Sequence, residues 1–157
     1  MENKKLLIDY CEYDSLAEME PRHSQLMEAA MQATTTAYAP YSHFHVGAAV
    51  LLADGSIVTG SNQENVAYPS GLCAERTALF SASAQKPAQA VEAIAIVGHF
   101  QGQYTEASPC GACRQVMAEY ETRYGNEITV FCYLNGGRIR KIKGVKSLLP
   151  FGFEAEL

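Results

Sequence analysis

The sequence has no long apolar run and no strongly basic segment. No stretch approaches the roughly 18 consecutive apolar residues that a membrane-spanning helix needs, and the formal net charge is −5 at pH 7. The most basic stretch, residues 138–143, alternates charged with apolar side chains. This alternation is typical of the outer face of a strand rather than of a nucleic-acid patch. We therefore expect neither a membrane nor a nucleic acid as a partner.

The cysteines do not form the even set that a disulfide framework requires. Five are present, and no basic, apolar and small-residue leader stands at the N-terminus. This pattern favours a reducing compartment, and we expect the protein to be cytoplasmic. Cys132 lies in an apolar, strand-like run and is expected to be a small core residue, whereas Cys11 suggests no role.

No internal repeat, low-complexity tract or linker divides the chain. At 157 residues with 48% hydrophobic content, the chain is long enough for one domain with a sound core. The first 19 residues are polar and acidic, and their few apolar side chains show no clear period. We predict an arm over residues 1–19, either flexible or a docking segment and without an assigned element, followed by a domain over residues 20–157.

Apolar periodicity predicts strands that alternate with helices. The predicted helices cover residues 21–38, 73–83, 109–124 and 145–149. The predicted strands cover residues 46–52, 57–61, 91–98, 128–134 and 138–143, and Asp54-Gly55 joins the first two as a hairpin. This order is typical of an α/β fold, here a three-layer α/β/α sandwich with a mixed five-stranded sheet. Parallel pairing of the strands at 91 and 128 would bring the starts of the second and third helices together.

Three cysteines stand at those two helix starts. Cys110 and Cys113 are three residues apart, so in a first turn that includes Pro109 both sulfurs can reach one tetrahedral ion. Cys73 would supply a third sulfur from the start of the helix over residues 73–83. Three protein ligands leave a fourth position open, which is typical of a catalytic zinc site.

Cys110 and Cys113 alone would also fit a redox pair or half of a structural zinc site. A structural site needs a fourth thiol or imidazole, but Cys132 and the histidines at 23, 43, 45 and 99 stand at no ligand spacing. We expect those histidines to be surface or polar-core residues.

Glu75 is not on the same helix face as Cys73, so we predict that it carries protons beside the metal instead of binding it. A non-ligand Glu followed by Pro-Cys-x-x-Cys is the pattern of zinc nucleobase deaminases.

Three separated motifs resemble the small homotetrameric cytidine deaminases in order and spacing. They are Tyr41-Ser42-His43-Phe44-His45-Val46-Gly47-Ala48-Ala49, Cys73-Ala74-Glu75-Arg76-Thr77-Ala78 and Ser108-Pro109-Cys110-Gly111-Ala112-Cys113-Arg114-Gln115. The resemblance covers the chain from about residue 20 onward, although the family often has Pro where His45 stands. It implies zinc-dependent hydrolysis of cytidine and 2′-deoxycytidine to uridine and 2′-deoxyuridine with release of ammonia, a reaction of pyrimidine salvage.

The resemblance also implies roles for individual residues. Cys73, Cys110 and Cys113 would hold one Zn²⁺ per subunit, and Glu75 would protonate N3 of cytosine and then the leaving amine. Three thiolates leave the zinc site at net −1, which two helix N-termini and hydrogen bonds from Arg76 would offset. The implied substrate contacts are Phe44 at the base, Asn62 and Glu64 at the ribose, and the backbone near Ala74 and Cys110. From the residues alone, Asn62 and Glu64 would also fit a polar loop, and Phe44 would fit simple core packing.

Two aromatic residues, Phe151 and Phe153, follow Pro150 near the chain end. They could pack back onto the domain or mark a contact surface. In the family, the aromatic three residues after the Leu-Leu-Pro reaches the active site of a neighbouring subunit, and this position is Phe153. The resemblance therefore implies a homotetramer with shared active sites.

Two other functions fit the same residues. Deamination of a cytosine-containing antibiotic nucleoside such as blasticidin S would use the same chemistry. A non-enzymatic, zinc-stabilised binding module would use the thiols alone. Loss of the cytosine absorbance band on addition of the protein to either nucleoside separates these alternatives.

Overall fold

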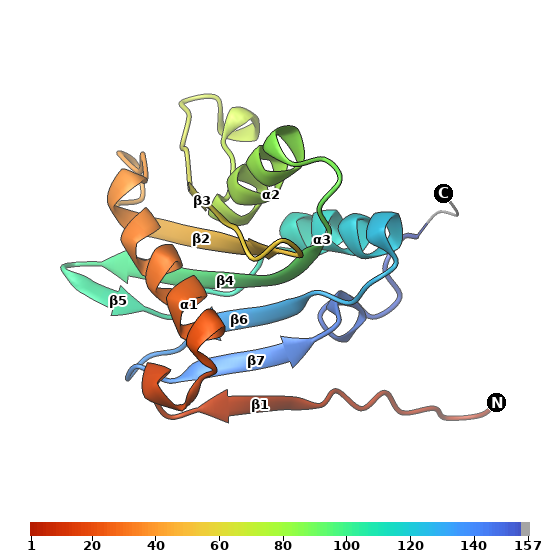
Figure 1. Cartoon of the computed structure of the whole chain (residues 1–157). Helices are drawn as coiled ribbons and strands as arrows, with labels where there is room; N and C mark the ends of the chain where they lie inside the picture. The colour runs from red at the N-terminus through yellow and green to blue at the C-terminus, as the bar shows by residue number, and fades with distance from the viewer. Residues whose placement is uncertain (155–157) are drawn as a thin grey trace.

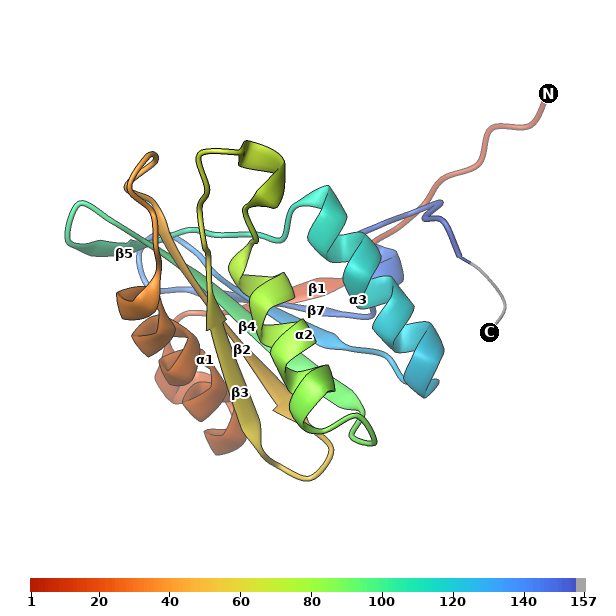
Figure 2. The same ribbon diagram turned by 90° about the horizontal axis from the view of Figure 1, so that it is seen from above.

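One mixed sheet lies between helices on both of its faces (Figure 1, Figure 2). The computed structural model describes residues 1–154. Its strands are β1 (Tyr10–Tyr13), β2 (His45–Leu52), β3 (Ile57–Ser61), β4 (Val91–Phe100), β5 (Gln103–Thr105), β6 (Thr129–Tyr133) and β7 (Ile139–Lys143). Its helices are α1 (Pro21–Ala33), α2 (Ala74–Gln85) and α3 (Gly111–Tyr124), with 3-10 turns η1 (Leu16–Glu18), η2 (Thr34–Thr36), η3 (Tyr68–Ser70) and η4 (Val145–Ser147). The predicted α/β/α sandwich is confirmed.

The sheet has the strand order β1-β7-β6-β4-β2-β3, and β5 pairs with the end of β4. β4 and β6 are parallel, as predicted, while the other pairs are antiparallel. All five predicted strands are present, but within residues 1–154 the sheet has seven strands instead of five. β5 was missed because three residues are too few to show a period.

Two cores result from the alternation of side chains along the strands. Ile94 and Ile96 join the core beneath α2 and α3, while Ala95 and Val97 join the core beneath α1. A strand buried on both faces reads as a continuous apolar run, as β4 does. At Gly60, a Cβ would overlap the backbone of α2. The absence of a side chain therefore lets α2 lie directly against β3.

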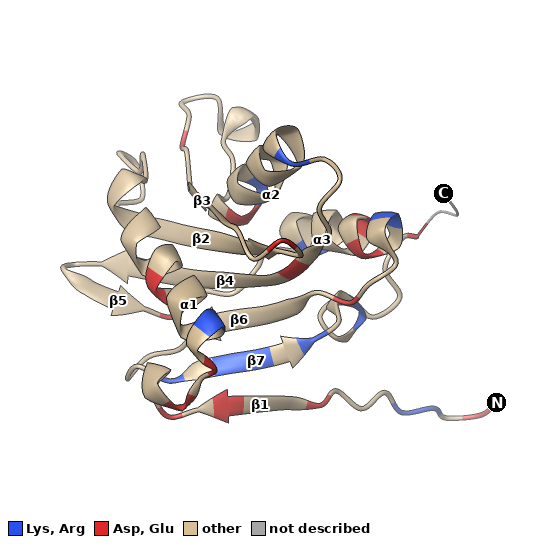
Figure 3. Cartoon of the chain, in the orientation of Figure 1, with Lys and Arg blue, Asp and Glu red and all other residues tan. Residues whose placement is uncertain are grey.

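Residues 10–19 belong to the fold, which differs from the expectation of an arm without an element. β1 pairs antiparallel with β7. Glu12 Oε2 accepts a hydrogen bond from Arg138 Nη1 at 2.9 Å, and Glu12 Oε1 accepts one from Arg140 Nε at 3.0 Å. Figure 3 shows this acidic strand beside the basic β7. Met19 is buried in the core beneath α1. The local sequence of this segment could not predict the contacts of Glu12, because the partner arginines lie more than a hundred residues away.

The helix boundaries differ slightly from the predicted ones. α1 ends at Ala33 and continues only as the turn η2, and residues 145–149 form the short η4 instead of a helix. α3 begins after Cys110, so Pro109 precedes the helix and is not part of its first turn. Gly125 ends α3 in the left-handed region with φ 66°. Among residues 1–154, no helix has the length and apolar character required to cross a membrane.

Candidate active site

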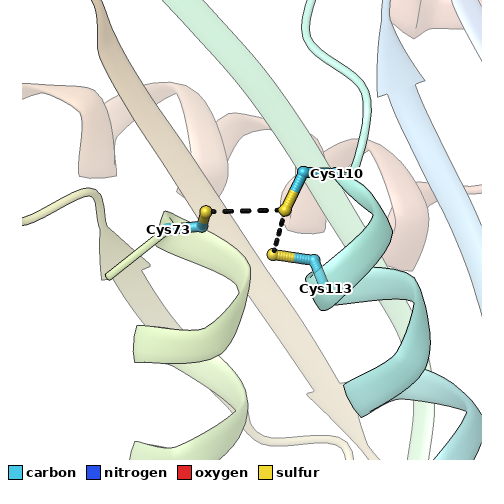
Figure 4. Close-up of side chains that lie close together, drawn as sticks. All are labelled: Cys73, Cys110 and Cys113. Carbon is cyan, nitrogen blue, oxygen red and sulfur yellow. Dashed lines mark hydrogen bonds between the residues drawn. The ribbon is translucent and has the colours of Figure 1, made fainter. Parts of the chain in front are cut away.

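Three cysteine sulfurs meet between the N-termini of α2 and α3 (Figure 4). Cys73 Sγ lies 3.7 Å from Cys110 Sγ, and Cys110 Sγ lies 3.4 Å from Cys113 Sγ. Sulfurs on a tetrahedral zinc with Zn–S bonds of about 2.3 Å stand roughly 3.8 Å apart. The three sulfurs therefore fit three corners of one zinc site. Within residues 1–154, no fourth His, Cys, Asp or Glu side chain joins this group, so one corner stays open for a water or a substrate atom.

Local structure and topology both position the sulfurs. Cys73 is the N-cap of α2 and Cys110 the N-cap of α3, and neither side chain caps its helix. Cys113 lies in the first turn of α3, next to Cys110. The crossover between the parallel strands β4 and β6 places α3 on the sheet face that α2 covers. The predicted meeting of the two helix starts is thus confirmed.

The electrostatics of the site favour a thiolate at Cys73. Both helix N-termini carry partial positive charge. Arg76 Nη2 donates a hydrogen bond to Cys73 Sγ across 3.7 Å. Hydrogen bonds from Cys113 and from Arg76 lower the pKa of the Cys73 thiol to about 5, while the contact with Cys73 and burial raise the pKa of Cys113. The chain therefore stabilises negative charge on one sulfur of the group, that of Cys73.

Glu75 lies in the first turn of α2 and is only 4% exposed. Burial raises the pKa of its carboxyl to about 7. The carboxylate is not among the groups close enough to share an ion with the three sulfurs. A carboxyl group with a pKa near neutrality can both accept and donate a proton during turnover, which fits the predicted role of a non-ligand proton carrier.

A cavity of about 840 Å³ opens beside the sulfurs. The predicted site residues that line it are Phe44, Asn62, Glu64, Cys73, Ala74, Glu75, Arg76 and Cys110. Its size is in the range typical of small-molecule sites. The structure therefore brings the proposed metal, proton-transfer and substrate groups around one space.

Phe153 is the one predicted substrate contact that does not line the cavity, and among the predicted metal ligands the buried Cys113 does not line it either. The side chain of Phe153 is 82% exposed and that of Phe151 is 98% exposed. The carbonyl oxygen of Phe153 accepts a hydrogen bond from Gln115 Nε2 at 2.7 Å, which ties the C-terminal segment to α3. Within residues 1–154, neither ring packs back onto the domain core, so that alternative is wrong.

Several lining residues were not predicted. They are Tyr41, Ser42, Val46, Gln63, Asn65, Tyr68, Gly71, Leu72, Glu106, Ala107 and Ser108. Tyr41, Ser42, Val46 and Ser108 lie inside the motifs already noted, so proximity to the predicted contacts could have identified them. The other seven show no pattern in the sequence that separates a cavity wall from an ordinary loop.

Asn62 and Glu64 face the cavity and also bind the loop over residues 41–46. Asn62 Oδ1 accepts a hydrogen bond from the backbone N–H of Val46 at 2.7 Å, and its Nδ2 donates to the carbonyl oxygen of Phe44 at 2.9 Å. Glu64 Oε2 accepts from the backbone N–H of Tyr41 at 2.9 Å. The sequence indicated the exposed polar pair but not this second role.

The remaining histidines and cysteines lie outside the sulfur group, as expected. His23 is buried, with its ring centroid 4.8 Å from that of Phe131. Cys132 is buried in the core beneath α2 and α3, and burial raises its pKa to about 11. Cys11 is exposed on β1.

Comparison with known proteins agrees with this geometry. Residues 20–125 match the model of the cytidine and deoxycytidylate deaminase zinc-binding region. A curated protein of Halalkalibacterium halodurans named cytidine deaminase is 45% identical over 131 residues, which cover 83% of this chain and 93% of the relative. One of Sporosarcina psychrophila with the same name is 47% identical over 132 residues, covering 84% and 91%. The crystal structure of cytidine deaminase from Burkholderia pseudomallei superposes with a TM-score of 0.72 at 43% identity, covering 83% of this chain and 98% of that one.

Proposed function

The chain belongs to the cytidine deaminase family, and on this basis we propose that it hydrolyses cytidine and 2′-deoxycytidine to uridine and 2′-deoxyuridine with release of ammonia. The observation that carries the proposal is the juxtaposition of an open three-sulfur site, a buried glutamate and a cavity of about 840 Å³, a volume typical of small-molecule sites. This reaction would serve pyrimidine salvage.

The chain's own residues divide the chemistry between them. Cys73, Cys110 and Cys113 would hold the zinc, which when bound supplies a Lewis acid that makes a water nucleophilic at neutral pH. Glu75 would accept a proton from the attacking water and donate it to N3 of cytosine as the hydroxide adds at C4. It would then take the proton of the resulting C4 hydroxyl and deliver it to the amino group, which leaves as ammonia while the water oxygen stays at C4 as the carbonyl oxygen. The raised pKa of Glu75, about 7, supports both transfers because neither protonation state is strongly favoured near neutral pH.

The substrate residues lie around the same cavity. Phe44 would pack against the base, Asn62 and Glu64 would bind the ribose hydroxyls, and the backbone near Ala74 would orient the base. Arg76 would keep the thiolate of Cys73 ionised through its hydrogen bond. These assignments follow the positions of the matching residues in the family.

The charges that line the cavity favour free nucleosides over nucleotides. Glu64 and Glu106 lie in the wall, and the sole cationic side chain there within residues 1–154 is Arg76, which is bound to Cys73. A 5′-phosphate would therefore gain no cationic partner and would meet carboxylates instead.

We further propose a homotetramer in which Phe153 of one subunit completes the site of its neighbour. The exposure of Phe151 and Phe153 supports this assembly, because large exposed aromatics at a chain end commonly mark contact surfaces. The catalytic domain would span residues 20–157, in agreement with the family match that begins at residue 20, and residues 1–19 would be an added segment that joins the sheet of this domain through β1. The requirement for reduced thiols supports the cytoplasm as its location.

A spectroscopic assay tests the proposed function. The zinc-loaded protein is mixed with cytidine, 2′-deoxycytidine or blasticidin S, and loss of the cytosine absorbance band is followed together with release of ammonia. We expect turnover of the two nucleosides. Turnover of blasticidin S alone would assign the chain to the antibiotic, and the absence of turnover with all three would reduce the site to a zinc-stabilised binding module.

A further inference from the structure

Ser42 connects the sugar-side carboxylate to the loop that carries Phe44. Its hydroxyl donates a hydrogen bond to Glu64 Oε1. Ser42 Oγ in turn accepts a hydrogen bond from the backbone N–H of Phe44 at 3.0 Å. One hydroxyl therefore links two residues that the proposed function places at opposite parts of the substrate, the ribose and the base.

The backbone of this loop is tightly turned. The N–H of His43 donates to the carbonyl oxygen of Ala39 at 3.0 Å, and His43 has φ 56°, a left-handed conformation that residues other than glycine rarely adopt. The turn brings the backbone N–H of Phe44 within hydrogen-bond distance of Ser42 Oγ. On the other side, Asn62 Nδ2 donates a hydrogen bond to the carbonyl oxygen of Phe44 at 2.9 Å. Both sides of the Phe44 backbone are thus held by side chains of the cavity wall.

Most of the hydrogen-bonding capacity of Glu64 is occupied by the same loop. Its carboxylate accepts from the backbone N–H groups of Tyr41 and Ser42 and from the Ser42 hydroxyl. The hydrogen bond from Ser42, followed by the one from Tyr41, lowers the pKa of Glu64. An ionised carboxylate offers about four acceptor sites, so roughly one remains. The loop therefore determines in which direction Glu64 can accept a hydrogen bond from a sugar hydroxyl.

We propose that Ser42 is a positioning residue that aims the Glu64 carboxylate at the sugar and holds Phe44 against the base. This inference rests on the proposed nucleoside deaminase function. Ser42 acts through Glu64 and through the backbone of Phe44, so its removal should weaken substrate binding without removing a group from the reaction itself.

Steady-state kinetics of three variants test this role. Ser42→Ala removes both hydrogen bonds, Ser42→Thr keeps the hydroxyl, and Ser70→Ala is the matched control, because Ser70 is exposed in η3 and makes no side-chain hydrogen bond within residues 1–154. We expect Ser42→Ala to raise KM for cytidine about tenfold, as fits loss of a hydrogen bond to a charged group, with kcat within about twofold of the parent. Ser42→Thr should restore KM.

A substrate analogue separates positioning from general damage to the fold. The Ser42→Ala effect on kcat/KM should shrink with 2′,3′-dideoxycytidine, which lacks the hydroxyls that Glu64 would bind. An equal loss with cytidine and with the analogue would overturn the role through Glu64. An unchanged KM for cytidine in Ser42→Ala would overturn the proposal as a whole.

Amide hydrogen exchange provides a readout that does not depend on the reaction. In Ser42→Ala the amide of Phe44 should exchange faster than in the parent and in Ser70→Ala, since its acceptor is gone. Unchanged exchange at Phe44 would contradict the positioning role even if cytidine proved not to be the substrate. Absence of turnover in the parent protein, by contrast, would count against the proposed function alone.

Discussion

Cys73 Sγ and Cys110 Sγ lie 3.7 Å apart, although 37 positions separate the two residues in the chain. Each residue is the N-cap of a different helix, and the two helices cover the same face of the sheet. The sulfur group therefore exists only when the core beneath α2 and α3 is formed. Metal binding at this group should consequently stabilise the folded chain.

Loss of a single sulfur ligand should remove both metal and activity. We expect Cys110→Ala and Cys113→Ala to fall from about one zinc per chain to near none, because two thiolates hold the ion far more weakly than three. Cys11→Ala, which removes an exposed thiol from β1, is the control and should keep its zinc. Metal analysis decides the matter, and a purified parent enzyme that is active without zinc would contradict this prediction.

The charges of the cavity wall predict a preference for substrates without a phosphate. We expect kcat/KM for CMP to be lower than that for cytidine by roughly tenfold or more, because a 5′-phosphate would face Glu64 and Glu106 without a free cation. Parallel assays at one ionic strength measure the ratio. Comparable values for CMP and cytidine would show that this electrostatic argument is wrong.

Phe153 should matter for substrate turnover although it lies outside the cavity of its own chain. We expect Phe153→Ala to raise KM or lower kcat while zinc content stays unchanged, because the ring would close a neighbouring site. Phe151→Ala is the control, since Phe151 is also largely exposed and precedes Phe153 by two residues. Sedimentation should detect a tetramer, and a fully active monomer at the assay concentration would exclude shared sites.

His23 should make the stability of the chain depend on pH. Burial lowers its pKa below the ordinary value of 6.5, and the Glu20 carboxylate only partly opposes this effect. His23 therefore binds a proton more readily in the unfolded chain than in the folded one. Its contribution to the free energy of unfolding is complete above pH 6.5, where the ring is neutral in both states, and is lost as the pH falls below 6.5.

The Tm of the parent and of the variants, measured between about pH 7 and pH 5, tests the role of His23. His23→Leu cannot take up a proton, so its Tm should fall less steeply with acidification than that of the parent. His99→Leu, which removes a partly exposed histidine, should follow the parent curve. Parallel curves for the parent and His23→Leu would show that His23 does not cause the pH dependence.

The metal site could be predicted from the sequence because its determinants are local. Cys110 and Cys113 are one turn apart, so their spacing alone brings the two sulfurs together. Cys73 and Glu75 stand at the start of one helix, where their spacing of two residues separates a metal ligand from a group that does not bind the metal. Only the meeting of the two pairs depends on the fold, and the alternation of strands and helices was sufficient to predict it.

Features that depend on distant partners could not be predicted in this way. The pairing of β1 with β7 brings together residues far apart in the chain, as in the contact of Glu12 with Arg138 across 126 positions. The second role of Glu64 depends on the backbone N–H groups of Tyr41 and Ser42, which lie in a loop 22 to 23 positions before it. Neither relationship produces a periodic pattern in the sequence, because each consists of isolated contacts between distant residues.

Glu75→Gln is the decisive variant for the proposal that Glu75 carries the protons of a zinc-dependent deamination. Zinc content and cytidine turnover are measured on the same sample, with Glu28→Gln, an exposed change on α1, as the control. We expect Glu75→Gln to keep its zinc and to lose activity by about 10²–10⁴-fold. Normal turnover by zinc-loaded Glu75→Gln would contradict this proposal.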